Sequence, residues 1–159
     1  MRKKYINLTI SNKQYSEKLE PKGETFTRKL NLEDEIELTT EGVLYKKNNA
    51  TYITYNESSE SGLENMKTML KIANGKILIR RFAKNSESKN MDMLLEEGVM
   101  NITRYSVTPA GILEMEIYTN SVKENLSEEG YGSIFADYKI KMEPIINVRN
   151  QLEIFVKPN

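Results

Sequence analysis

The stretch that decides the fold is residues 41–82, EGVLYKKNNATYITYNESSESGLENMKTMLKIANGKILIRRF. Apolar and polar residues alternate along its runs, which is the pattern of β-strands with one buried face. The dipeptides Asn48-Asn49 and Asn74-Gly75 each separate two such runs. Asparagine and glycine tolerate the positive φ that two-residue hairpin turns require, so the stretch is predicted to fold as consecutive antiparallel strands.

These two turns also predict which residues face one another. The Asn-Gly turn places Thr68 opposite Arg81, and the Asn-Asn turn places Gly42 opposite Tyr55. A glycine inside a strand marks a bend or a close approach of two backbones, and an aromatic ring laid over it is a known device of curved sheets. We therefore expect this sheet to curl rather than lie flat.

Alternating runs continue on both sides of the central stretch. They cover residues 6–10, 36–42, 91–97, 99–107, 113–119, 134–142 and 152–156. Together they predict nine or ten strands with short links, which is the signature of an antiparallel sandwich or barrel. The turn at 108–111 is predicted to place Tyr105 opposite Met115.

Two segments depart from this strand pattern. Residues 12–34 are polar and contain Pro21 and Gly23, so they are predicted to form a long loop or an irregular hairpin. Ser121 and Glu124 have capping-box spacing, and a glycine follows at position 130. Residues 121–129 are therefore predicted to form one short helix, with an acidic loop as the alternative.

Composition limits the functions open to the chain. Its 159 residues suffice for a single domain, predicted over 1–159 with its core in 35–157, and its 23 basic and 23 acidic residues balance. Balanced charge gives no preference for nucleic acid, and no apolar run approaches membrane-spanning length. The N-terminus does not resemble a signal peptide, so we expect a cytoplasmic protein with neither nucleic-acid nor membrane partners. The sequence carries no signal for an oligomeric state.

The order of motifs resembles the YwiB-like family of uncharacterised bacterial β-barrels of the calycin, or lipocalin-like, type. The matching residues are Thr40-Glu41-Gly42, residues 52–57, Gly62, Lys67-Thr68, Lys71, Arg81, Gly98, Tyr105, Gly111, Thr119, Gly132-Ser133-Ile134 and Tyr138-Lys139-Ile140. The chain departs from the family pattern in lacking a glycine shortly after Arg81 and in its enlarged segment 12–34. The resemblance implies one antiparallel up-and-down calycin-like β-barrel of roughly eight to ten strands, but it supplies no activity.

An up-and-down course brings several polar strand ends to one end of the barrel. Glu57, Thr68, Arg81 and Tyr105 fall there, and Tyr55 lies one inward position below Glu57. We predict these five residues as a ligand-binding site. Arg81 would anchor an anionic head, and the apolar interior would take the rest of a small, apolar or anionic ligand.

Other interpretations of the same residues stay open. Glu57 and Arg81 could form a structural ion pair, or Arg81 could extend to water from a strand end. The barrel could be filled by side chains and act as a structural or protein-interaction module without a ligand. Catalysis would depend on Glu57 and Tyr105, since histidine and cysteine are absent, and we expect no enzymatic activity.

Lack of histidine and cysteine also predicts that the protein carries no cofactor metal. These two residues supply most ligands of transition metals in proteins. Elemental analysis of the purified, untagged protein should detect no stoichiometric zinc, iron or copper. One equivalent of any of them would contradict this prediction.

Overall fold

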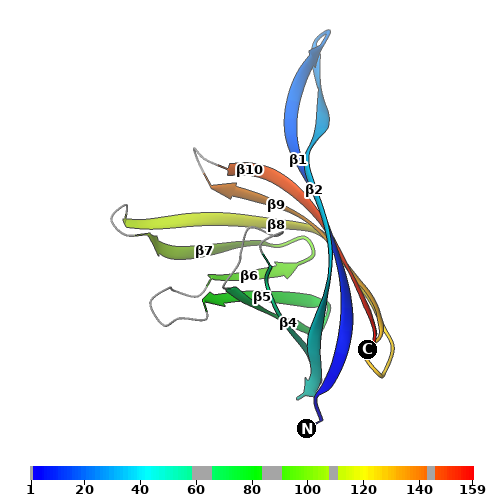
Figure 1. Cartoon of the computed structure of the whole chain (residues 1–159). Helices are drawn as coiled ribbons and strands as arrows, with labels where there is room; N and C mark the ends of the chain where they lie inside the picture. The colour runs from blue at the N-terminus through cyan, green and yellow to red at the C-terminus, as the bar shows by residue number, and fades with distance from the viewer. Residues whose placement is uncertain (1, 59–65, 84–90, 108–110, 143–145) are drawn as a thin grey trace.

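Ten antiparallel strands form a single sheet in the computed structural model, which describes residues 2–58, 66–83, 91–107, 111–142 and 146–159 (Figure 1). The strands are β1 (Lys4–Lys22), β2 (Thr25–Lys47), β3 (Ala50–Asn56), β4 (Met66–Ala73), β5 (Lys76–Ala83), β6 (Met91–Glu96), β7 (Met100–Val107), β8 (Gly111–Leu126), β9 (Gly132–Met142) and β10 (Ile146–Pro158). Their order in the sheet is β6-β5-β4-β3-β2-β1-β10-β9-β8-β7. Within the described residues there is no helix long and apolar enough to cross a membrane.

The sheet curls until its two edge strands, β6 and β7, lie next to each other. No backbone ladder joins them in the described ranges. Side chains of β7 bridge the gap instead: the Thr103 hydroxyl donates to the Asp92 carbonyl at 2.7 Å, and the Asn101 amide donates to the Leu94 carbonyl at 3.0 Å. These bonds satisfy carbonyls on the edge of β6 that would otherwise lack partners. The result is an all-β, up-and-down antiparallel barrel, as the sequence predicted.

The two turns, Asn48-Asn49 and Asn74-Gly75, predicted correctly the registers of β2 with β3 and of β4 with β5. Thr68 pairs with Arg81, and Gly42 pairs with Tyr55. The predicted register of β7 and β8 is wrong by two residues, because Tyr105 pairs with Leu113. Gly111 was counted in the turn, whereas it is the first residue of β8. A shift of two preserves which side chains face inward, and Met115, Ile117 and Thr119 of β8 are buried.

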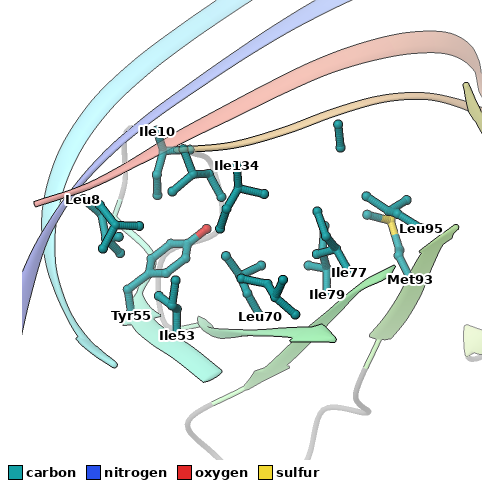
Figure 2. Packing of buried hydrophobic residues seen from close by; sticks show 14 of the residues in the cluster. Leu8, Ile10, Ile53, Tyr55, Leu70, Ile77, Ile79, Met93, Leu95 and Ile134 are labelled. Carbon is teal, nitrogen blue, oxygen red and sulfur yellow. The ribbon is translucent and has the colours of Figure 1, made fainter. Parts of the chain in front are cut away.

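The interior of the barrel is apolar and closely filled (Figure 2). Side chains that are at most 1% exposed come from strands all around the sheet: Ile6, Leu8, Leu44, Ile53, Leu70, Ile77, Ile79, Leu95, Ile117, Ile134 and Ile154. Full burial of one such side chain contributes about 1.5–3 kcal/mol. Curling the sheet is what brings these positions from distant strands into one core.

Residues 12–34, for which a loop and a hairpin were both open, form a hairpin of regular strands. β1 pairs with β10 as far as Ser16, and beyond that residue β2 is its only partner among the described strands. The two strands continue as a ribbon to the turn at Gly23, which has φ +64°. In Figure 1 this ribbon projects away from the barrel.

The predicted helix at 121–129 is wrong. β8 continues through Leu126, and its pairing with β9 skips Asn120, which is the extra residue of a β-bulge. The bulge moves the interior positions from odd residues such as Thr119 to even residues such as Val122. Pairing with β9 outweighs the local capping pattern. Gly130 lies in the turn that follows, where its N–H donates to the Ser127 carbonyl at 2.9 Å.

Gly42 allows a close approach between the strands where the sheet curls. A Cβ at this position would lie 2.8 Å from the Thr54 carbonyl oxygen and 2.9 Å from Cδ1 of Leu8. Gly42→Val should therefore lower the free energy of unfolding by about 1–3 kcal/mol, because backbone and core must both shift. Urea unfolding measures this loss. Gly42→Ala shares the Cβ and should show part of it, whereas an unchanged midpoint for the valine variant would contradict the close approach.

Candidate functional site

A cavity of about 130 Å³ lies in the barrel interior, between strands that are distant in the sequence. β1, β2, β9 and β10 line one side, and β3, β4 and β5 line the other. Its apolar wall is formed mainly by Ile10, Leu38, Leu70, Ile79 and Ile154. Figure 2 shows Ile10, Leu70 and Ile79 within this packed interior, together with the ring of Tyr55. A compound placed here would contact mostly hydrocarbon.

Two residues of the cavity wall carry buried polar atoms without partners. Nε of Arg81 and Oδ1 of Asn12 are both buried, and neither has a hydrogen-bond partner among the described residues. The amide nitrogen of Asn12 is used, since it donates to Oδ1 of Asn150 at 3.4 Å. The wall of the cavity therefore contains one unused donor, on a cation, and one unused acceptor. Most buried polar atoms in proteins are satisfied, and of the three unsatisfied side-chain atoms among the described residues two belong to this cavity wall, the third being Oγ1 of Thr119.

Glu57 takes its hydrogen bond from the neighbouring strand rather than from Arg81. The hydroxyl of Thr68, which is fully buried, donates to Oε1 of Glu57 at 2.6 Å. Within the described residues, no ion pair of 4.0 Å or less joins Glu57 and Arg81. The structural ion pair considered from the sequence is therefore not formed, and Arg81 lines the cavity without it.

Two tyrosines add hydroxyl groups beside Arg81. Burial raises the pKa of Tyr55, Glu57 raises that pKa further, and the charge of Arg81 opposes both effects. Burial likewise raises the pKa of Tyr138, against a smaller opposing effect of Arg81. Both hydroxyls thus stay protonated across the physiological range. A protonated hydroxyl can donate a hydrogen bond to an anion.

The structure brings together most of the residues predicted from the sequence. Arg81, Glu57 and Tyr55 line the cavity, and Thr68 supports it through its bond to Glu57. The side chain of Tyr105 lies outside the described part of the structure.

Sequence reasoning missed Asn12 and Tyr138 as cavity residues. Asn12 was assigned to the segment read as a loop or hairpin, although it continues the inward phase of Ile6, Leu8 and Ile10. Tyr138 was correctly placed on an alternating strand. No turn signal, however, connects β9 to the strands around Arg81.

Fold and site together define the class: an antiparallel β-barrel with a small interior cavity and a cationic group in its wall. Comparison with known proteins gives the family. The family described as "Domain of unknown function (DUF1934)" matches residues 22–154, and the chain belongs to it.

Two comparisons with a protein of Bacillus subtilis agree with this assignment. The "Uncharacterized beta-barrel protein YwiB" of strain 168 is 32% identical over 94 residues, 59% of this chain. The alignment spans 61% of that relative's length. The crystal structure of the ywiB protein superposes with a TM-score of 0.63 at 24% identity, covering 98% of this chain and 93% of the other. The second match supports the barrel fold alone.

A second polar cluster lies on the outer face of the sheet and is fully paired. Asp137 receives two hydrogen bonds from Arg149, at 2.8 and 2.7 Å, and one each from Asn120 and Gln151. The bulge in β8 is what places Asn120 beside this carboxylate. Burial alone would raise the pKa of Asp137, but these hydrogen bonds and the charge of Arg149 outweigh it and lower the pKa. With its partners satisfied, this cluster is structural.

Asp137→Asn should lower the free energy of unfolding at pH 7 by about 1–3 kcal/mol, because it leaves the half-buried Arg149 with only its longer contact to Glu17, at 3.9 Å. A depressed pKa stabilises the fold above the unfolded-state value of about 3.9, and this contribution disappears as the pH falls through the folded-state pKa. The difference between wild type and variant should therefore shrink in acid. Urea unfolding at several pH values measures it.

Asp92→Asn is the matched control for this prediction. Asp92 forms a similar two-bond pair with Arg80, both bonds at 2.9 Å, but both side chains are about 40% exposed, at 42% and 41%. Exposed pairs contribute about 0–1 kcal/mol. Equal losses in the two variants, or a loss for Asp137→Asn that persists unchanged in acid, would contradict the role given to burial.

Proposed function

We propose that the protein binds a small anionic compound with an apolar body in the cavity beside Arg81. The buried, unpartnered Nε of Arg81 carries this proposal. A buried donor without an acceptor costs about 1–3 kcal/mol, and a bound carboxylate would remove that cost. Arginine presents its donors in a planar fork that matches a carboxylate, so the head group would bind in a defined orientation.

The other polar atoms constrain how the ligand lies. The hydroxyl of Tyr138 can donate to the same anion, since it stays protonated, whereas the hydroxyl of Tyr55 is engaged by Glu57. Oδ1 of Asn12 can accept a hydrogen bond from a hydroxyl or amide on the ligand. Glu57 disfavours a second negative charge beside it, so the head belongs on the Arg81 side and away from Thr68.

The size of the cavity limits the body of the ligand. A cavity of about 150 Å³ lined by aliphatic and aromatic side chains holds benzene. Drug-sized ligands occupy pockets of about 300–1,000 Å³. At about 130 Å³, the cavity suits a single ring or a short alkyl chain rather than a long fatty acid.

We also propose that this calycin-like barrel is a cytoplasmic protein, and that it binds its ligand without catalysing a reaction. Without cysteine the chain forms no disulfide, so its folding needs no oxidising compartment. The second candidate function is a protein-interaction module. It is supported by the exposed ribbon of β1 and β2, because a projecting apolar ribbon is a feature of binding surfaces.

Arg81→Met should abolish binding of small aromatic and short-chain carboxylates, with benzoate and valerate as probes. The variant keeps the length of the side chain but removes the charged donors. Amide chemical shifts of β1, β3 and β5 in two-dimensional NMR titrations report binding at this cavity. We expect at least a tenfold loss of affinity, the value of one charge-assisted hydrogen bond of about 1.4 kcal/mol or more.

Arg80→Met is the matched control, because Arg80 is the adjacent residue and faces outward toward Asp92. It should leave benzoate binding unchanged. Benzyl alcohol, which has the ring without the charge, should bind wild type and Arg81→Met equally. No shift change at the cavity of the wild type with any carboxylate, or equal binding by both arginine variants, would overturn the proposal.

A further inference from the structure

The ribbon of β1 and β2 carries an apolar face that nothing in the described structure covers. Phe26, Leu30 and Leu32 of β2 are 67%, 39% and 52% exposed. The reason is a bulge at Glu33, since Gln14 pairs with Asp34 but Tyr15 pairs with Leu32. One extra residue turns the even positions of β2 from the barrel interior to the outer face. The same alternation that buries Leu38 therefore exposes three large apolar side chains.

The backbone edge of β2 is also open along this segment. β3 pairs with β2 only from Gly42 to Lys47, and no described strand pairs with residues 25–41 on the side away from β1. An open edge presents alternate N–H and C=O groups that can pair with another strand. In Figure 1 the ribbon stands clear of the remaining strands, so access to this edge is free.

The sequence of this edge is complementary to itself in the antiparallel direction. It reads Arg28-Lys29-Leu30-Asn31-Leu32-Glu33-Asp34-Glu35, with cations before the central asparagine and carboxylates after it. Counting the bulge at Glu33 as one position with Leu32, an antiparallel partner centred on Asn31 sets Arg28 beside Glu35, Lys29 beside Asp34 and Leu30 beside Leu32. Each pair lies on a single face of the joined sheet, and each occurs twice by symmetry.

We propose that β2 pairs with β2 of a second copy of this chain, antiparallel about Asn31, to form a two-fold symmetric dimer. The four charged side chains are exposed and available for these contacts. The pair that Lys29 forms with Glu20 is long, 3.7 Å, and exposed, so it competes weakly. Edges that avoid pairing usually carry charges that repel a second copy. Here the opposite signs are arranged so that two copies attract.

A second copy also fits the ribbon better than other occupants. Residues 17–33 carry four acidic and four basic side chains, which gives no attraction to a nucleic acid or to an anionic membrane. Pairing of two ribbons makes a four-stranded sheet, in which the rows of Phe26, Leu30 and Leu32 from the two copies become adjacent. A lone two-stranded ribbon is marginally stable, and two added strands remove that weakness. This inference is independent of the ligand proposed for the cavity.

Sedimentation velocity of the full chain across the micromolar range tests the dimer. Wild type should sediment with twice the mass of one chain. The variant Arg28→Glu/Lys29→Glu and the variant Asp34→Lys/Glu35→Lys should each be monomeric, because like charges then face one another. An equimolar mixture of these two variants should recover the dimer, since every pair across the axis again has opposite signs. Near-ultraviolet circular dichroism checks that both variants remain folded.

Lys22→Glu/Lys157→Glu is the charge-matched control. It changes the net charge as much as the first variant, at two exposed lysines outside β2, and should leave the dimer intact. A wild type that stays monomeric throughout would overturn the proposal, and so would a dimer that survives either reversal. A mixture that fails to associate would overturn the assigned register and with it the pairing about Asn31.

Discussion

The structure depends on one constraint, the two-residue alternation of side chains along every strand of a sheet that curls on itself. Once the sheet closes, alternate residues of ten strands share one interior, and each must be apolar or find a polar partner there. The close contact at Gly42 permits the curl, and side chains of β7 complete it at the seam with β6. This alternation decides which side chains form the core and the cavity wall and which face solvent.

Two bulges alter the alternation, and each has a separate consequence. The bulge at Asn120 keeps β8 in register with β9 while changing which residues point inward, and it brings an amide to the paired carboxylate of Asp137. The bulge at Glu33 turns the apolar row of β2 outward and so creates the exposed ribbon. In a period-two structure, a single extra residue is enough to move a surface from inside to outside.

The sequence predicts strand pairings and shared sites well where the paired segments are close together along the chain, and poorly where they are far apart. The two asparagine-containing turns predicted their hairpins, and through them Arg81, Thr68, Glu57 and Tyr55 on neighbouring strands. Asn12 and Tyr138 reach the same cavity through strands separated from β5 by long stretches of chain, and no local pattern encodes that contact. The helix predicted at 121–129 failed for a related reason, because pairing with a distant strand outweighed local capping signals.

Apolar packing does not account for the buried polar atoms of the interior that lack hydrogen-bond partners. Most of the barrel is filled by aliphatic side chains, yet two residues of one cavity wall carry a guanidinium nitrogen and an amide oxygen that are buried without partners. A structural cation would be paired, as Arg149 and Arg80 are on the outer face. The contrast between these paired arginines and Arg81 supports a binding site in the barrel.

A crystal structure of the protein grown with benzoate tests this account most directly. The account predicts a carboxylate against Nε of Arg81 and an aromatic ring between Leu38 and Ile154, with the strands unmoved. An empty barrel in which Arg81 forms an ion pair with Glu57, or points outward into solvent, would contradict it.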